Sequence, residues 1–177
     1  MEWTCRCGAF AAEVETRRGI RAVCYCESCR AFAERTGATG ALDAAGGSDL
    51  FQVAPEEVLF LKPDAPLAWI KLTDKGPARW FTTCCNTPVA NTMPTPGIPF
   101  VTLMSHRFAD PDALGPVRAR VYRRFATQRV PDDGGGTGAL LRNFAVRALR
   151  SRLTGGWRRN PFFTTTGEPI AARTEAD

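Results

Sequence analysis

No apolar stretch of this chain approaches the roughly 18 residues needed to cross a bilayer, and no basic segment followed by a short apolar one opens it. The first absence excludes a transmembrane helix on sequence grounds. The second leads us to expect a cytoplasmic protein. No internal repeat is evident either, beyond two C-x-C elements.

The composition favours β-structure. Of the 177 residues, 16 are glycine and 13 are proline, while 44% are apolar. Many turn-forming residues favour short strands joined by turns over a helical bundle. The sequence therefore predicts a mainly β protein of small antiparallel sheets, in one domain with an appendage. We expect strands near residues 10–15, 21–26, 49–53, 58–62, 67–72, 78–83, 100–104 and 117–125.

Charge is unevenly distributed along the chain. The overall balance is +5, but the part up to Gly115 has 11 basic and 13 acidic residues, whereas the part from Pro116 onward has 12 basic and 5 acidic ones. The C-terminal part is thus the basic one. The global excess is too small for a nucleic-acid footprint, so nucleic acid is not expected as a partner.

Three cysteines stand within six residues, at Cys24, Cys26 and Cys29. On a strand, side chains at i and i+2 leave the same face about 6 to 7 Å apart, so the first two thiols can converge on one ion with Zn–S bonds of about 2.3 Å. A turn after them can bring the third sulfur to the same ion. A tetrahedral ion with three protein ligands keeps a fourth position for water or substrate, as catalytic sites do.

A buried apolar cluster or a disulfide is the other interpretation of such close cysteines. The chain has seven cysteines, an odd number, and a reducing compartment keeps thiols free. Thiolate ligands are therefore the better interpretation, and we predict Zn²⁺ as the cofactor, with one or two ions per chain. Cys29 would lie in the first turn of a short helix over 27–35, where the helix dipole favours a thiolate.

The other four cysteines form two pairs far apart in sequence. Cys5 and Cys7 make a second C-x-C at a strand end, and Cys84 and Cys85 follow the strand expected over 78–83. Adjacent residues of a strand point to opposite faces. Joint ligation by Cys84 and Cys85 therefore requires a kink in the backbone.

Three cysteine motifs thus follow one another along the chain: C-x-C-G, C-x-C-x-x-C-R and a late cysteine pair before proline, at Cys5–Gly8, Cys24–Arg30 and Cys84–Pro88. This combination resembles the glutathione-dependent formaldehyde-activating enzyme and centromere protein V family, over roughly residues 3–107. The resemblance implies a zinc-stapled β-tent fold with a closed four-sulfur site and an open three-sulfur site tied to glutathione adducts. It makes the middle motif the open site, and the first motif with Cys85 structural ligands.

The fourth structural ligand departs from the family pattern. Where the family has a cysteine followed three residues later by Cys-Gly, this chain has Thr82 and then Cys85-Asn86, with an extra thiol at Cys84. Three alternatives are open. Cys84 substitutes through a distorted turn, water or His106 completes the site, or the site is lost.

Beyond residue 130 the composition changes. Residues 131–138, rich in glycine, are expected to link a zinc-binding β domain over 1–130 to a basic C-terminal helix and tail over 139–177. A helix expected over 139–153 has a wide apolar arc with arginines opposite. The arc comprises Leu140, Leu141, Phe144, Val146, Leu149 and Leu153, and the arginines are Arg147 and Arg150.

Several roles for this helix remain open. It could dock on its own β domain, or on a partner subunit in a homo-oligomer. It could anchor the protein to an anionic membrane surface. Nucleic acid is the remaining interpretation, because the aromatic residues Trp157, Phe162 and Phe163 are interleaved with basic ones, although in no ordered pattern.

Five further side chains could take part in chemistry. His106, the only histidine, could be a ligand or general acid, although most such residues are hydrogen-bonded in place. Glu27 could be a base or a solvated carboxylate at a helix start. Lys71, Lys75 and Arg79 could meet a glutathione carboxylate, or could simply lie on a surface strand.

Two functions are consistent with these patterns. The first is a zinc-dependent carbon–sulfur lyase acting on an adduct of glutathione or another thiol, such as S-hydroxymethylglutathione. Three thiolates leave zinc a mild Lewis acid, which suits thiol activation better than water activation. The second is a zinc-stapled binding module without catalysis, which interacts through the basic C-terminal helix.

Overall fold

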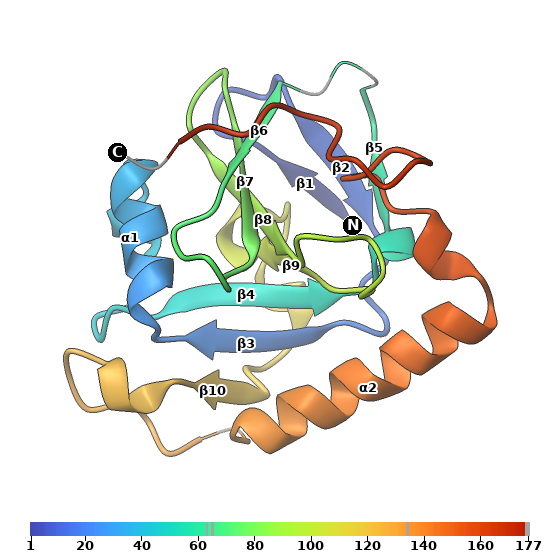
Figure 1. Ribbon diagram of the computed structural model, residues 1–177. Coiled ribbons are helices and arrows are strands. Elements are labelled where there is room, and N and C mark those ends of the chain that lie inside the picture. Colours follow the sequence, from blue (N-terminus) through green and yellow to red (C-terminus); the bar gives the residue numbers. More distant parts are fainter. Residues whose placement is uncertain (63, 65, 134, 176–177) are drawn as a thin grey trace.

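The computed structural model describes residues 1–62, 64, 66–133 and 135–175 (Figure 1). In this part of the chain, strands dominate and two α-helices are present. The helices are α1 (Glu27–Arg35) and α2 (Thr137–Leu153). The prediction of a mainly β fold, with one short helix after the second cysteine motif and one C-terminal helix, is confirmed.

Seven strands form the larger sheet, in the spatial order β10-β3-β4-β9-β8-β7-β6. Neighbours run antiparallel, except that β10 and β3 are parallel. The strands are β3 (Ile20–Cys24), β4 (Ser48–Val53), β6 (Leu67–Ile70), β7 (Ala78–Thr82), β8 (Pro88–Thr92), β9 (Val101–Met104) and β10 (Ala119–Val121). Because β3 lies next to the edge strand β10, the cysteine that ends β3 lies near one side of the sheet.

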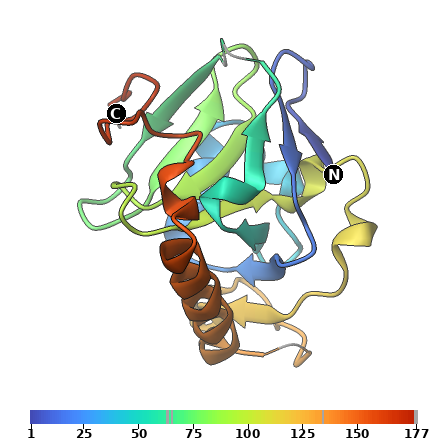
Figure 2. The same ribbon diagram turned by 90° about the vertical axis from the view of Figure 1, so that its right-hand side faces the viewer.

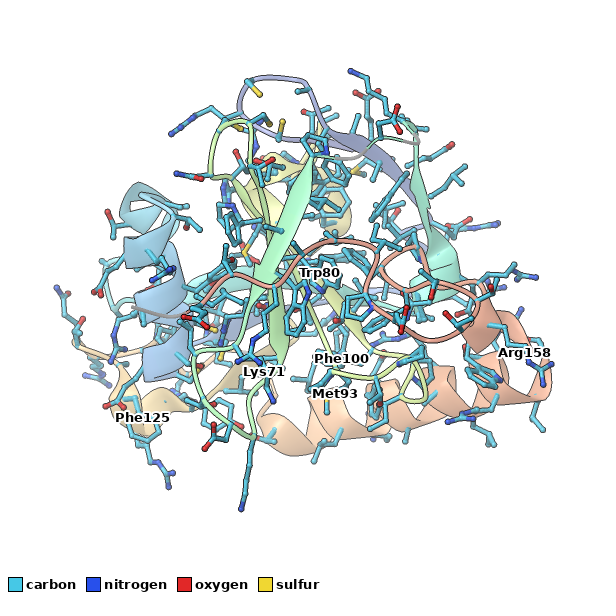
Figure 3. All side chains as sticks on the ribbon, turned by 45° about the horizontal axis from the view of Figure 1, so that its top comes forward. Lys71, Trp80, Met93, Phe100, Phe125 and Arg158 are labelled. Carbon is cyan, nitrogen blue, oxygen red and sulfur yellow. The ribbon has the colours of Figure 1, made fainter. Side chains whose placement is uncertain are left out.

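A smaller sheet, in the order β1-β2-β5, is joined to the larger one by aromatic side chains. Its strands are β1 (Glu2–Thr4), β2 (Ala11–Val14) and β5 (Val58–Phe60). Phe10 contacts Phe60 and Phe60 contacts Phe162, with ring centroids 5.0 and 5.1 Å apart. Phe162 in turn lies 5.0 Å from Trp80 of β7, near the middle of the molecule (Figure 3). These rings make one continuous core.

Most strands lie where they were expected, but β8 was not predicted and β10 is shorter than the strand expected over 117–125. β8 begins at Pro88 and contains Asn91, residue types that weaken a strand pattern in a sequence. β10 ends at Val121. The next residue, Tyr122, takes a left-handed backbone conformation with φ 58°, and a 3₁₀ turn follows.

Helix α1 has the bounds that were predicted. Cys26 precedes it in an extended conformation, and Gly37, with φ 67°, follows its last turn. A positive φ costs glycine little, so this residue ends the helix without strain. Phe32, on the inner side of α1, is buried in the core.

Helix α2 packs against the sheets through only part of its predicted apolar arc. Leu140 packs against the main core, and the Phe144 ring lies 5.9 Å from that of Phe100. Arg147, which was expected opposite the apolar arc, lies on the buried side of the helix: it is 5% exposed and donates to Gln52 and to the Arg18 carbonyl. The side of α2 that carries Arg147 is therefore the packed side, because acceptors on the β-domain satisfy its guanidinium.

The segment after α2 packs back onto the sheets (Figure 1). Phe162 and Phe163 are buried in the main core, and the backbone of Trp69 in β6 exchanges hydrogen bonds with Ala172 and Thr174 at 3.2 and 2.9 Å. The domain boundaries expected at residues 130 and 138 stay a prediction. Within the part of the chain that the structure describes, neither helix combines the length and the apolar character of a membrane span.

Two candidate metal centres

The first centre lies where β3 ends and α1 begins. Cys24 is the last residue of β3, Cys26 is the N-cap of α1, and Cys29 lies in its first turn. Side chains alternate along the extended part, so Tyr25 is buried on the other side, where its hydroxyl donates to Asp43 at 2.9 Å. This alternation directs Cys24 and Cys26 to the same side, toward the main core.

The three sulfurs of this centre lie together. The Sγ atoms of Cys24 and Cys26 are 3.3 Å apart, and all three sulfurs lie within 4.8 Å of one another. Tetrahedral zinc with bonds of about 2.3 Å would place its sulfur ligands about 3.8 Å apart, so the group fits such an ion. Among the residues described, no fourth Cys, His, Asp or Glu side chain joins it. Cys24 and Cys29 are buried, and Cys26 is half-buried.

A buried arginine from β7 stands against this three-sulfur group. Arg79 is 2% exposed, and its two Nη atoms lie 3.8 and 3.9 Å from the Sγ of Cys29. It donates to the hydroxyl of Ser28 at 2.6 Å and to the side-chain oxygen of Asn91 at 2.9 Å. Over the described residues no carboxylate pairs with it, and its Nε has no partner. Because a buried cation needs a counter-charge, the neighbouring thiolates are the groups that can supply it.

The three thiols of this centre do not ionise equally. The pKa of Cys26 lies far below the ordinary thiol range, because the side chains of Cys24 and Cys29 donate hydrogen bonds to its sulfur. The pKa of Cys24 is raised by its contacts with the same two neighbours and by burial. Cys26, the most accessible of the three, is therefore the first to become a thiolate.

The second centre joins the end of β1 to the turn between β7 and β8. Cys5 and Cys7 follow β1, and Cys84 and Cys85 lie in that turn. Asn86, in the same turn, has a left-handed φ of 53°, which asparagine tolerates better than most residues. A turn removes the strict alternation of faces, so neighbouring cysteines can reach the same ion. This is the kink that joint ligation requires.

All four sulfurs of this second group lie within 4.8 Å of one another. The Sγ of Cys84 is 3.9 Å from that of Cys5, 3.3 Å from that of Cys7 and 3.7 Å from that of Cys85. A disulfide would need about 2.05 Å, and all seven cysteines are free. Cys84 thus lies close enough to the other three sulfurs to serve as the fourth ligand, and neither sulfur group includes His106 in the described part of the chain.

Hydroxyl groups surround Cys85. The Oγ1 atoms of Thr82 and Thr87 lie 3.3 and 3.1 Å from its Sγ. Burial acts to raise the pKa of Cys85, but hydrogen bonds from these hydroxyls outweigh it and lower the pKa to about 5. The second centre is therefore poised to carry a thiolate, although Cys7 and Cys84 are exposed to solvent.

The structure separates the other predicted residues. His106 and Glu27 are exposed and join neither sulfur group within the described residues. Lys71 and Lys75 lie in the segment between β6 and β7, where Lys71 donates to a carbonyl of its own turn at 2.6 Å. Of the three basic residues considered for a substrate carboxylate, Arg79 is the one placed at the three-sulfur group.

Four polar residues around the centres were not predicted. Asn91 and Thr102 orient the arginine, since Asn91 also donates to the hydroxyl of Thr102 at 2.9 Å. Thr82 and Thr87 hold Cys85. Asn91 and Thr102 come from strands that pair only in the folded sheet, so no local spacing marks them, whereas Thr82 and Thr87 flank the Cys84-Cys85 pair in sequence. Polar side chains at buried strand positions are the one signal that could have drawn attention to them.

A small cavity lies beside Cys29, with Phe32, Arg79 and His106 among its lining residues. Its volume is about 10 Å³. This is room for about one water molecule. The cavity beside Cys29 therefore has no room for a larger molecule.

These features define a class: a mainly β protein with two cysteine groups that could each hold a metal ion. The chain belongs to the family of unknown function DUF6151, whose profile matches residues 1–173. No curated protein matches the sequence. Among solved structures, a Rhodobacter sphaeroides protein determined as a structural-genomics target is 20% identical, covering 66% of this chain and 97% of that chain with a TM-score of 0.45. This likeness is too remote to bear on function.

Proposed function

We propose that the protein is a zinc-dependent carbon–sulfur lyase acting on an adduct of glutathione or another small thiol, such as S-hydroxymethylglutathione. The observation that carries the proposal is the three-sulfur group, which has no fourth ligating side chain among the described residues and lies against a buried cation. An ion held there keeps one position for an outside sulfur. The four-sulfur group, which needs no outside ligand, would hold a structural zinc ion.

Zinc bound by the trio would supply a Lewis acid that lowers the pKa of an incoming thiol. In the lyase direction, the carbon–sulfur bond of the adduct breaks and its electron pair stays on sulfur. The hydroxyl group of the adduct loses its proton and becomes the carbonyl of formaldehyde. In the reverse direction, the thiolate attacks formaldehyde and the new alkoxide takes up a proton.

The protein's own residues divide the work. Cys24, Cys26 and Cys29 would hold the ion and leave one side of it open. Arg79 stabilises the negative charge that accumulates when an anionic sulfur joins three thiolates. A unit charge about 4 Å away is worth about 4 kcal/mol at an effective dielectric constant of about 20. Arg79 is a positioning residue here, since it touches Cys29 rather than the substrate.

A reducing compartment fits this chemistry. All seven cysteines are free, including the exposed Cys7 and Cys84. Cytosolic thiols are kept reduced by the glutathione pool, which would also supply the substrate. We therefore place the reaction in the cytoplasm.

The test is exchange between ¹³C-formaldehyde and glutathione, followed by NMR with the zinc-loaded protein. We expect exchange above the uncatalysed rate, and loss of that increment in a variant with Cys24, Cys26 and Cys29 all changed to serine. Arg159→Gln, which removes an exposed cation from the segment after α2, is the control and should keep it. A protein that carries two zinc ions and gives no acceleration would contradict the proposal.

A second candidate, the zinc-stapled binding module, is favoured by the exposed side of α2. The same triple serine variant distinguishes the two. If the trio is a catalytic site, the variant stays folded; if it is a structural staple, the variant loses its cooperative unfolding transition.

A further inference from the structure

Helix α2 turns an apolar side to solvent. Its outward residues Leu141, Val146, Leu149 and Leu153 are 59%, 66%, 62% and 79% exposed. At about 100° per residue they fall within an arc of about 140° opposite the buried Arg147. The helix lies on the outside of the molecule, with no strand or helix beyond it (Figures 1 and 2). A group of exposed leucines on one side of a helix marks a contact surface.

Arginines border this apolar side. Arg142 and Arg152 fall among the leucines on the helical wheel, Arg150 lies at its edge, and α2 contains no acidic residue. We call the outward leucines, Val146 and these three arginines the α2 face.

A groove of about 760 Å³ lies between α2 and the start of β3 and continues the basic character of the α2 face. Among the residues described, five arginines and no carboxylate line it: Arg18, Arg118, Arg142, Arg147 and Arg150. In the described part of the chain, none of the five forms an ion pair. Arg18 and Arg150 also line a neighbouring hollow with Glu15, Glu56 and Glu57, so the charge is partly balanced at that end. Arg118 and Arg142 have no such acidic neighbours among the described residues of the groove, and the side next to the leucines keeps an excess of positive charge.

The end of the α2 face carries an amphipathic aromatic ring. The guanidinium groups of Arg152 and Arg158 lie 4.5 and 5.2 Å from the ring centre of Trp157, just past the helix (Figure 3). Tryptophan and arginine side chains combine an apolar body with a polar or charged end, which suits the boundary between lipid headgroups and acyl chains.

We infer that the α2 face docks on an anionic lipid surface. Leucines would enter the acyl boundary while arginines meet lipid phosphates. A second copy of the chain fits less well, because a twofold contact would set the arginines of one α2 against those of the other with no acidic residue between them. An anionic lipid surface is complementary to both parts of the face: acyl chains to the leucines, and phosphates to the arginines. This inference does not depend on the proposed lyase activity.

The experiment is co-sedimentation of the zinc-loaded full chain with vesicles of phosphatidylcholine alone or mixed with phosphatidylglycerol, at low and high salt. We expect binding to the mixed vesicles only, weakened by salt. Arg142→Gln with Arg150→Gln should weaken it about 30-fold, since each basic residue near an anionic surface contributes about fivefold. Leu149→Ser with Leu153→Ser should weaken it at least about tenfold.

Matched controls carry the same changes elsewhere. Arg124→Gln with Arg129→Gln removes two exposed charges away from α2, and Leu59→Ser with Leu61→Ser removes two exposed leucines from the β5 segment. Both controls should bind within about twofold of the unaltered protein. Circular dichroism confirms that each variant is folded.

Four outcomes would overturn the inference. They are no binding to either vesicle, equal binding to both vesicles, and self-association that the leucine change abolishes, which would make the face a dimer surface. The fourth is binding that depends on the arginines but not on the leucines and is abolished by inorganic phosphate, which would make the groove a site for a small anion.

Discussion

The four-sulfur and three-sulfur groups use the same donor atom in opposite surroundings. The four-sulfur group lies between a strand end and a turn, and two of its cysteines are exposed to solvent. The three-sulfur group is more enclosed, with Cys24 and Cys29 only 7% and 6% exposed. The four-sulfur group, which has enough donors for a tetrahedral ion, is open to water. The three-sulfur group, which has one donor fewer, is shielded from it.

Under the proposed function, this difference separates a structural zinc site from a reactive one. A closed tetrahedral site has no reactive position to protect, so exposure costs it little. An ion with an unfilled position binds whatever reaches it, so burial and a neighbouring charge decide what that is. Arg79, held by Ser28 and Asn91, supplies the charge. Beside the four-sulfur group the neighbouring polar groups are neutral: the hydroxyls of Thr82 and Thr87 lie against Cys85.

The largest expected effect is on folding. Changing Cys5 and Cys84 to serine should lower the free energy of unfolding by more than about 5 kcal/mol. A structural zinc site forms only in the folded protein, so the free energy of zinc binding adds to the stability of the fold. Thermal unfolding followed by circular dichroism, with and without a chelator, measures it. The serine variant of Cys24, Cys26 and Cys29 is the comparison and should lose much less. Equal losses in the two variants would erase the distinction between staple and reactive centre.

A smaller effect is expected from the arginine. Arg79→Met should weaken zinc binding at the three-sulfur group by about 10- to 100-fold, as loss of an outer-shell partner does. It should also cost about 2 to 3 kcal/mol of stability, because the oxygens of Ser28 and Asn91 lose a charged donor. Zinc competition with a chromophoric chelator reads the first effect, and urea unfolding reads the second.

Arg79→Lys separates charge from packing. It keeps the cation and should recover part of the zinc affinity, although the bidentate contacts to Ser28 and Asn91 are lost. If lysine and methionine weaken the three-sulfur group equally, the charge plays no part. Zinc at the four-sulfur group should not respond to either change.

The smallest effect concerns the turn that carries Cys84 and Cys85. Asn86→Gly should stabilise the protein by about 0.5 to 1 kcal/mol, since the φ of 53° suits glycine. Asn86→Ala should destabilise it by about 1 kcal/mol. Urea unfolding measures both. The reverse order would mean that the Asn86 side chain, rather than its backbone, supports the turn.

The sequence was most informative where one short segment carries the feature. The bounds of α1 and the convergence of Cys24, Cys26 and Cys29 follow from spacing within a few residues, and most strands from runs bounded by proline and glycine. The joint position of Cys84 and Cys85 could only be left open, because it depends on whether the chain turns at Asn86.

Features that depend on distant segments escaped sequence analysis. Arg79 meets Cys29 across 50 residues, through strands whose pairing no local pattern specifies. Arg147 is polar by type, yet acceptors of the β-domain bury it. Four of the six residues of the apolar arc of α2 face solvent for the same reason, since helical periodicity identifies an apolar side but not what covers it.

The most direct test of the account is anomalous diffraction at the zinc edge from crystals grown with glutathione. Two ions are expected: one bound by Cys5, Cys7, Cys84 and Cys85, and one bound by three protein sulfurs with the glutathione sulfur at its fourth position. An absent second ion, or a protein side chain already in that fourth position, would contradict it.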